Sequence, residues 1–234
     1  MTGAGPAVTY REQPAGVPGV ELWVRSSGPA TTRSRILPDG CLDLIWDGRE
    51  LIVAGPDSAA RWHDSPAGAV YTGLRFHRGL GPALLQLPAS EVLDLSPGLA
   101  QVWPDAAARP LAERVARDPA GTLLAWLAQR VLDCPADPLG PRVHALARRA
   151  TPVALMADQL GLSARQLHRR CLPVFGYGPR RLSRILRMTR ALDRARAGQP
   201  LAEVAAVCGY ADQAHLAREL AALGGAPPTS LLAG

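Results

Sequence analysis

Apolar and polar positions along the chain follow two different periods, and the period changes near residue 83. Before that point the apolar runs are short and partly alternating, which is typical of β-strands. Four runs show this pattern: 20–25, 41–46, 50–55 and 70–76. The second and third flank Asp47 and Gly48, a pair typical of tight hairpin turns. The first part of the chain is therefore predicted to be a small β-barrel or β-sandwich.

Beyond residue 83 apolar residues recur at every third or fourth position, which predicts amphipathic helices. The clearest case is 122–132 (TLLAWLAQRVL), and similar patterns cover 88–95 and 110–118. Three prolines are expected to interrupt these helices: Pro104, Pro110 and Pro119. A proline-rich stretch from Pro135 to Pro141 then predicts a linker. We place a domain boundary there, between residues 1–136 and residues 137–234.

After the linker one pattern occurs twice. The first copy is 153–172 and the second is 201–223, with Gly161 and Gly209 at equivalent places. In each copy an alanine four residues before the glycine lets two helices approach closely, and the glycine can adopt a positive φ. Ser163 is expected to cap the second helix of the first copy. The repeat predicts two helix-turn-helix units.

A long basic helix is predicted between the units. Pro179 suits its start, and Gly198-Gln199-Pro200 suits its end. Its apolar face is formed by Leu182, Ile185, Leu186, Thr189, Leu192 and Ala195. Its arginines, which would either face solvent or contact phosphates, are Arg180, Arg181, Arg184, Arg187, Arg190 and Arg194. The predicted fold class is α+β: a β-rich barrel or sandwich with following helices, then an all-α domain.

The distribution of charge supports this division, because the net positive charge lies in the predicted helical domain. The net charge is +6; residues 1–140 carry 12 arginines against 15 acidic residues, whereas residues 141–234 carry 14 against 5. A polyanion such as double-stranded DNA would therefore bind the C-terminal part.

Composition argues against several other classes. No apolar run is long enough for a membrane helix and the N-terminus does not resemble a signal peptide, so we expect a cytoplasmic protein with no membrane partner. The cysteines at 41, 134, 171 and 208 form no C-x-x-C pair. Neither a metal site nor a disulfide is therefore expected, and no cofactor is predicted.

Three segments of the C-terminal part carry a more specific signal: LGLSARQLHRR (160–170), FGYGPRRLSRILR (175–187) and VAAVCGYADQAHLARE (204–219). With them, residues 141–230 resemble the DNA-binding domain of AraC/XylS-type transcription regulators. In the N-terminal part, ILPDGCLDLIW (36–46) resembles the LPDGCxDLI signature of a small sensor-like domain found ahead of this module in one subgroup.

The resemblance implies a sequence-specific DNA-binding transcription regulator that reads two adjacent major-groove segments. It leaves three further partners open: a small-molecule effector of the N-terminal domain, RNA polymerase and a second copy of the chain.

The resemblance also assigns residues that would read DNA. From the first recognition helix these are Arg165, Gln166, His168 and Arg169. From the second they are Gln213, Ala214, His215 and Arg218. Arginine suits guanine and glutamine suits adenine, so these residue types can discriminate bases. On the connecting helix, Arg180 and Arg184 are the candidate phosphate contacts.

Departures from the family pattern are expected to weaken the second unit. The chain lacks aromatic residues that are usual at three positions, Cys171, Leu216 and Leu220. Ala211 stands where serine is usual, although Asp212 offers another cap. Glu219 places a negative charge beside Arg218. We therefore expect the second unit mainly to position the protein, while the first carries more sequence information.

An enzyme is the first alternative for the N-terminal part. Cys41 together with Asp39, Asp43, His63 and His77 contains the residue types of a nucleophilic site, in an enzyme or in a repair protein that accepts methyl groups on cysteine. A repair site of that kind would need clustered cysteines for zinc, and the first 130 residues hold one cysteine. We therefore predict no catalytic residues.

A ligand pocket is the second alternative. The aromatic residues of the predicted β-part form either its core or a pocket: Trp23, Trp46, Trp62, Tyr71 and Phe76. The candidate ligand-binding residues are Trp23, Asp39, Asp43 and Trp46. In a third interpretation this domain binds no small molecule and only mediates protein interaction, through residues 83–132.

Overall fold

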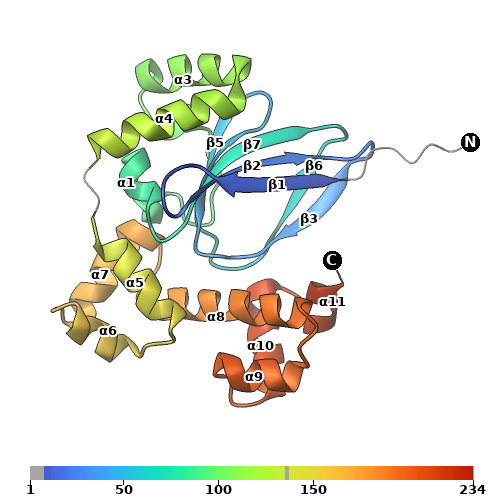
Figure 1. The fold of residues 1–234 in the computed structure, drawn as a ribbon, viewed down its shortest axis with the longest axis vertical. Helices are drawn as coiled ribbons and strands as arrows, with labels where there is room; N and C mark the ends of the chain where they lie inside the picture. Colours follow the sequence, from blue (N-terminus) through green and yellow to red (C-terminus); the bar gives the residue numbers. More distant parts are fainter. Residues whose placement is uncertain (1–7, 135–136, 234) are drawn as a thin grey trace, which may run out of the picture.

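The structure is a computed structural model that describes residues 8–134 and 137–233. Its N-terminal part is a β-sandwich with helices packed on it, and its C-terminal part is built from helices and short loops (Figure 1). The predicted α+β fold class is confirmed. The predicted domain boundary falls beside residues 135–136, which lie outside the described ranges, so it stays a prediction.

Five antiparallel strands form the main sheet, in the spatial order β1-β2-β7-β4-β5. The strands are β1 (Thr9–Pro14), β2 (Val20–Ser26), β7 (Val70–Phe76), β4 (Leu42–Trp46) and β5 (Leu51–Ala54). A two-stranded antiparallel ribbon, β3 (Thr32–Ile36) with β6 (Arg61–Ser65), lies against one face of this sheet (Figure 1).

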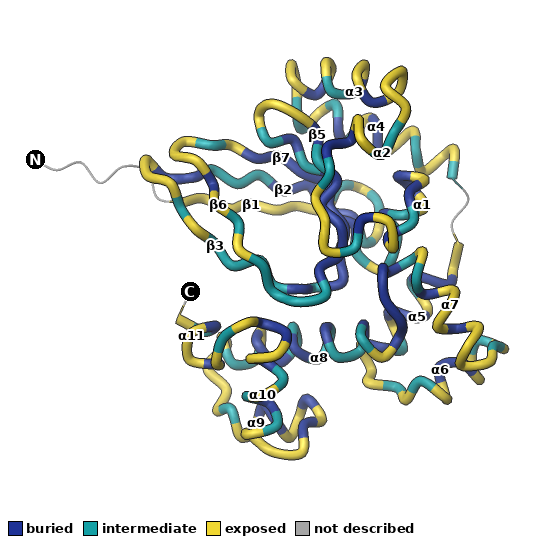
Figure 2. The backbone as a smooth tube through the Cα atoms, turned by 180° about the vertical axis from the view of Figure 1, so that it is seen from behind, coloured by how far each residue is buried: buried dark blue, intermediate teal, exposed yellow. Residues whose placement is uncertain are grey.

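The four predicted strands are confirmed as β2, β4, β5 and β7. The sequence prediction missed β1, β3 and β6, whose residues are mostly polar and lack an apolar alternation. Figure 2 shows β1 exposed along its length. Backbone pairing with β2 makes it a strand, and this pairing leaves no hydrophobic signal in the sequence.

The predicted hairpin joins β4 to β5 with a four-residue loop, because Trp46 pairs with Leu51. Asp47 Oδ1 accepts the backbone N–H groups of Arg49 and Glu50, both at 2.8 Å, and Gly48 adopts a φ of 94°. The aspartate and the glycine therefore each stabilise the turn in the way their residue types suggest.

Side chains alternate between the two faces of the main sheet, and one face forms the first core. Leu42, Leu44 and Trp46 of β4 point into this core, together with Leu74 and Phe76 of β7. Helices cover it: α1 (Gly81–Leu85), α2 (Leu99–Val102), α3 (Asp105–Arg117) and α4 (Pro119–Asp133). Alternate residues such as Asp43 and Ile45 therefore face the ribbon instead.

Two helix predictions were wrong in detail. Residues 88–95 contain a short 3₁₀ turn, η1 (Ala89–Glu91), and not a helix. Pro110 does not interrupt α3 but lies within it, at an exposed position where the unpaired carbonyl of the preceding turn can bind water. Pro104 and Pro119 do precede or open helices, as predicted.

The C-terminal part contains α5 (Leu139–Arg148), α6 (Val153–Gln159), α7 (Ala164–Phe175), α8 (Pro179–Arg196), α9 (Leu201–Cys208), α10 (Gln213–Gly224) and α11 (Pro228–Leu232). The predicted limits of α8 are confirmed, and Leu182, Ile185 and Leu192 lie in a second core as expected. The prediction had placed Thr189 on the apolar face of this helix, but the fully buried residue is its neighbour Met188.

Each helix-turn-helix turn contains its predicted glycine in a left-handed conformation. The φ of Gly161 is 67° and that of Gly209 is 76°. A Cβ atom at either position would meet nothing within 4 Å, so backbone conformation and not space selects glycine there. The alanines four residues earlier, Ala157 and Ala205, are buried as predicted.

Replacing Gly209 tests this explanation. We expect Gly209→Ala to cost about 1–2 kcal/mol of stability, because an L-residue with a side chain resists this φ. Gly209→Asn should cost less, because asparagine tolerates the left-handed region. Thermal or urea unfolding of the full chain measures both, and equal losses for the two variants would contradict the backbone argument.

Candidate nucleic-acid interface and ligand cavity

The first helix-turn-helix unit consists of α6 and α7. Ser163 caps α7: its hydroxyl accepts the Gln166 N–H at 3.2 Å, and Gln166 Oε1 accepts the Ser163 N–H at 2.8 Å. The predicted cap is confirmed, and the partner that completes it is a predicted base-reading residue. Gln166 therefore has its amide oxygen occupied, which leaves its NH₂ group free to donate.

The other predicted residues of α7 lie on its outer side. Arg165, His168 and Arg169 are exposed, while Leu167 and Cys171 are buried against the second core. Gly178, just before α8, lies directly under the His168 ring, because a Cβ there would overlap it. His168 therefore packs on the start of α8, whereas the two arginines form no hydrogen bond or ion pair with the described residues.

The second unit consists of α9 and α10, and Asp212 caps its recognition helix. The Asp212 carboxylate accepts the His215 N–H at 2.6 Å, so the alternative cap is the one used. His215 is half-buried: its Nδ1 accepts the Ala211 N–H at 3.2 Å, and its ring packs edge-on against Tyr210. Gln213, Ala214 and Arg218 are exposed.

Glu219 binds two arginines of α8 and is not paired with Arg218. Arg184 donates to both Glu219 oxygens, at 2.9 and 3.1 Å, and Arg187 lies 3.5 Å away. Burial alone would raise the pKa of Glu219, but the hydrogen bond and charge of Arg184 outweigh it and hold that pKa below its ordinary value. The expected negative charge beside Arg218 is therefore neutralised by α8.

Most of the predicted phosphate-facing arginines of α8 bind the protein itself. Arg187 lies over the Tyr210 ring at 4.4 Å, and Arg190 donates to the carbonyls of Arg148 and Cys208. Solvent and phosphate were the two partners predicted for these arginines, and hydrogen bonds within the protein were not predicted. Arg180 is exposed, at the edge of a cleft of about 630 Å³ between the two units.

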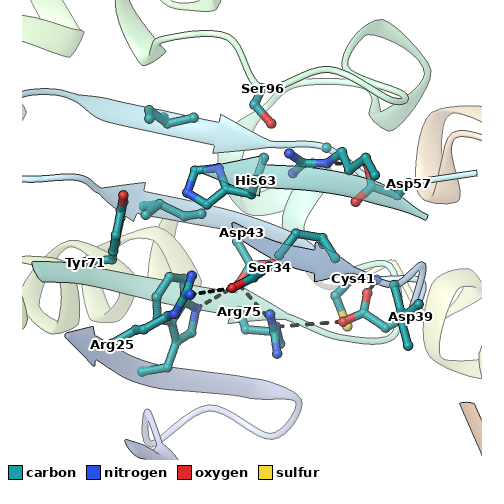
Figure 3. A pocket seen from close by; sticks show the side chains of 18 of the residues that line it. Arg25, Ser34, Asp39, Cys41, Asp43, Asp57, His63, Tyr71, Arg75 and Ser96 are labelled. Carbon is teal, nitrogen blue, oxygen red and sulfur yellow. Dashed lines mark hydrogen bonds and ion pairs between the residues drawn. The ribbon is translucent and has the colours of Figure 1, made fainter. Parts of the chain in front are cut away.

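The N-terminal part contains a separate cavity of about 400 Å³, on the sheet face that points to the ribbon (Figure 3). Its lining includes Trp23, Asp39 and Asp43, three of the four predicted ligand residues. Trp46 was placed wrongly: strand alternation puts it on the opposite face, in the core beneath the helices. This cavity is the candidate ligand site.

Ion pairs connect the polar groups of the cavity. Asp43 Oδ1 accepts the Trp23 indole N–H at 2.8 Å and lies 3.2 Å from Arg75 Nε. Burial raises the pKa of Asp43, and the charge of Arg75 opposes that rise. Burial likewise raises the pKa of Asp57 to about 6, although Arg61 lies 2.8 Å away.

The sequence prediction missed the basic residues of the cavity, Arg25, Arg61 and Arg75, together with His63 in this role. On β7 the alternation of side chains could have indicated two lining residues, because Tyr71 and Arg75 lie four positions apart and both point to the cavity. The basic residues of β6 lay on a strand that was not predicted, so no alternation could place them.

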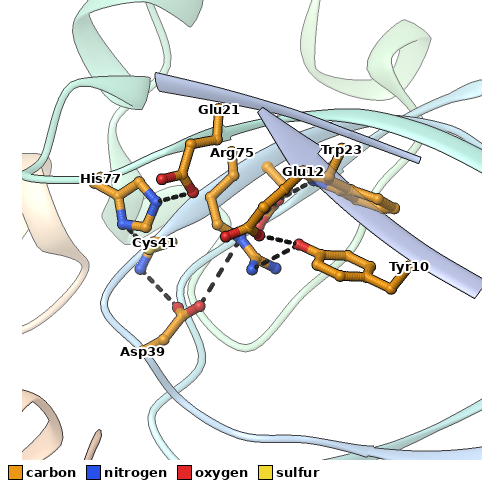
Figure 4. Close-up of polar contacts among 9 residues, drawn as sticks. Tyr10, Glu12, Glu21, Trp23, Asp39, Cys41, Arg75 and His77 are labelled. Atoms are coloured by element: carbon orange, nitrogen blue, oxygen red, sulfur yellow. Dashed lines mark hydrogen bonds and ion pairs between the residues drawn. The ribbon is translucent and has the colours of Figure 1, made fainter. Parts of the chain in front are cut away.

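Cys41 forms a hydrogen-bonded chain with His77 and Glu21 (Figure 4). Cys41 Sγ lies 3.1 Å from His77 Nδ1, and His77 Nε2 lies 2.8 Å from Glu21 Oε2. Burial raises the pKa of the Cys41 thiol well above its ordinary value, and the charges of Asp39 and Asp43 add to this. The geometry is that of a nucleophile with a base, but the electrostatics keep the thiol protonated.

Two loops line the cavity on one side and contact the helical domain on the other. In the loop after β3, Leu37 and Asp39 line the cavity, and a Cβ added at the next residue, Gly40, would lie 3.3 Å from Leu182 of α8. In the loop after β5, Asp57 lines the cavity and the Ser58 carbonyl accepts the Arg181 guanidinium at 2.6 Å.

The backbone N–H of Ala60 also donates to the Leu223 carbonyl of α10, at 2.7 Å. We call residues 37–41 and 55–60 the shared wall. These two loops lie between the cavity and the domain that contains the two helix-turn-helix units.

None of the helices in residues 8–134 and 137–233 is long and apolar enough to cross a membrane. Within the same residues no group of three or more histidine, cysteine or acidic side chains could hold a metal ion.

Comparisons with known protein families match two separate parts of the chain. Residues 156–234 match a family model described as a helix-turn-helix domain, and residues 20–96 match one described as a domain of unknown function (DUF6597). The C-terminal part is thus a helix-turn-helix domain. None of the curated proteins matches the chain.

Solved structures of ToxT from Vibrio cholerae are similar over most of their length. One, from strain O395, is 9% identical with a TM-score of 0.47 and covers 92% of this chain and 98% of that chain. Another, bound to (E)-4-(8-methylnaphthalen-1-yl)but-3-enoic acid, is 12% identical with a TM-score of 0.48, at the same coverage of 92% and 98%.

Thiol labelling tests whether Cys41 is activated. Cys41, Cys171 and Cys208 are buried and Cys134 is partly exposed. We expect a maleimide to modify Cys134 quickly in the folded protein and the other three only after unfolding. Mass spectrometry counts the labels, and Cys134→Ser should remove the fast one. Fast modification of Cys41 in that variant would support the nucleophile alternative.

Proposed function

We propose that this chain is a sequence-specific DNA-binding transcription regulator of the AraC/XylS type. The observation that carries the proposal is the pair of helix-turn-helix units at the two ends of one helix, α8 (Figure 1). Both units lie in the part of the chain that holds 14 arginines against 5 acidic residues. This charge favours a polyanion, and the paired units favour the major groove.

Helix α8 would fix the phase of the two recognition helices. It contains 18 residues, or roughly 27 Å at 1.5 Å per residue. Neighbouring major-groove segments on one face of B-DNA are about 34 Å apart. A single chain would therefore bind an asymmetric site of about two turns, with some bending of the DNA.

The side chains divide into two roles in this proposal. Arg165 and Arg169 are exposed cations of α7 and would bind guanine edges, with Arg218 and Gln213 contributing from α10. Arg180, at the cleft between the units, would bind a phosphate. Arg184 would act as a positioning residue, because its contact with Glu219 holds α10 against α8.

Control by a ligand is the second part of the proposal. The shared wall supports it, because each of its two loops contains residues that line the cavity and residues that contact α8 or α10. A ligand that shifted either loop would change the position of the recognition helices. RNA polymerase and a second copy of the chain are further partners that this function would involve.

Base reading is tested by replacing arginines of α7 and α8 separately. Arg165→Ala or Arg169→Ala should cost about 1–3 kcal/mol on the preferred site and relax preference at one or two positions. Arg180→Ala should weaken all sequences alike and lower the salt dependence by about one unit, as expected for a lost phosphate contact. Selection of bound fragments from random DNA, followed by titrations at several salt concentrations, measures both.

The three variants carry the same loss of charge, so each serves as a control for the others. If all three lose affinity equally on every sequence, α7 does not read bases. If the wild-type chain selects no sequence at all, the proposed function itself is wrong.

Coupling through the shared wall is tested with DNA as the probe, because linkage between two sites is reciprocal. Binding of the selected DNA should change hydrogen exchange of the amides in 37–41 and 55–60, with β2 as an internal reference. Arg181→Leu removes the bonds to Ser58 and should reduce this change at least twofold, whereas Arg181→Lys retains the charge and part of the contact. Unchanged exchange in the wild-type loops would favour a domain that only mediates protein interaction.

A further inference from the structure

The cavity holds three arginines and three aspartates, but their pairing is uneven. Arg61 lies 2.8 Å from Asp57. Arg75 lies 3.2 Å from Asp43 and 3.9 Å from Asp39. Each carboxylate therefore already faces a cation, and none of these contacts involves the third arginine.

Arg25 is that third arginine, and its partners in the described residues are neutral. Its guanidinium donates to the hydroxyls of Ser34 at 2.8 Å and Ser65 at 3.2 Å. Among residues 8–134 and 137–233 no carboxylate lies within ion-pair distance of it. A half-buried guanidinium held by two hydroxyls is oriented but not neutralised, so an anion in the cavity would gain a charge-assisted hydrogen bond.

The groups around Arg25 suit the same role. Tyr71 lies opposite Arg25 in the β2–β7 register, and His63 lies opposite Ser34 in the ribbon. Burial lowers the pKa of His63, and the charges of Arg61 and Arg25 lower it further. His63 is therefore neutral at pH 7 and can donate a hydrogen bond without adding a charge.

The middle of the cavity is apolar. The Trp23 indole lies over Gly73, because a Cβ at Gly73 would be 2.6 Å from the indole ring. Ile45 and Ile52 also line this part. In the β2–β7–β4 register, the level of Arg25 and Tyr71 lies four positions from that of Arg75 and Asp43, or about 13 Å along the strands.

We propose that the cavity binds a small organic carboxylate whose acid group pairs with Arg25 and whose apolar body lies over Trp23. A volume of about 400 Å³ is within the range of small-molecule sites. Arg25 is the one arginine of the cavity without a carboxylate partner among the described residues, and this single unneutralised charge favours a singly charged acid over a phosphate ester. The body of such an acid extends from Arg25 toward the shared wall, where Asp39 and Leu37 lie. This inference rests on the proposed control of DNA binding by a ligand.

A matched set of probes tests the ligand class on the full chain. The probes are 4-phenylbutanoate, the corresponding amide, the corresponding amine and 4-phenylbutyl phosphate, each titrated by calorimetry at pH 7. The carboxylate should bind at least tenfold more tightly than the other three. The inference is overturned if the amide or amine binds as well as the acid, if the phosphate ester binds more tightly, or if none of the four binds.

Variants locate the acid group. Arg25→Gln should lower affinity for 4-phenylbutanoate at least tenfold, and Arg25→Lys should restore part of it because the charge returns. Arg33→Gln is the matched control, because Arg33 is an exposed cation of the ribbon that does not line the cavity. Equal binding by the wild-type chain and Arg25→Gln would assign the acid to another residue and overturn the inference.

The same proteins separate this inference from the proposed function. Without any probe, Arg33→Gln should bind the selected DNA as the wild-type chain does. DNA binding without carboxylate binding would refute the ligand class alone. Carboxylate binding without DNA binding would refute the proposed function and leave the ligand class standing.

Discussion

Backbone hydrogen bonds of the shared wall join the two halves of the chain, together with apolar contacts such as that of Leu37 with the second core. The Ser58 carbonyl accepts Arg181, and the Ala60 N–H donates to the Leu223 carbonyl. Backbone groups that lose a partner have to find another, so residues 55–60 cannot shift without replacing these bonds to α8 and α10 with other bonds or with water. Gly40 adds a close approach to α8 that a side chain would crowd. A displacement of residues 55–60 would therefore disturb contacts of both α8 and α10.

The cavity forms because different elements pack on the two faces of the main sheet. Helices α1 to α4 bury the face that carries Leu44 and Leu74, and the narrow β3–β6 ribbon spans the other face. Two strands are too few to fill that space with side chains. The residues left there are aliphatic, aromatic and polar, and most of the polar groups satisfy one another through ion pairs and the Trp23–Asp43 hydrogen bond. What remains unneutralised is Arg25, and this defines the chemistry that we propose for the ligand.

The arginines of α8 show how a basic helix can be structural. Arg184 and Arg187 bind Glu219, while Arg190 binds two backbone carbonyls from neighbouring helices. Such charge-assisted contacts are directional, so they set the orientation of α9 and α10 relative to α8 more tightly than apolar packing alone would. In the proposed function this rigidity matters, because two recognition helices can enter adjacent grooves only if their separation is fixed.

The sequence by itself determined the local elements of this protein. Glycine at 161 and 209 predicted the two turns because few other residues accept a positive φ, and Ser163 predicted a helix start because its hydroxyl satisfies a free N–H. Apolar alternation predicted β2, β4, β5 and β7 because their inner faces are buried.

The tertiary structure alone decided which polar side chains meet. Nothing local to Cys41 predicts His77 and Glu21 as its neighbours, and nothing local to Glu219 predicts Arg184 as its partner. Trp46 was misassigned for the same reason. A tryptophan is a residue type that can bind a ligand, and only the sheet register shows which face of the sheet it occupies. Hydrogen bonds between residues far apart in the sequence depend on how the helices and strands pack. The sequence of one helix or strand indicates only whether one of its faces is apolar and will be buried.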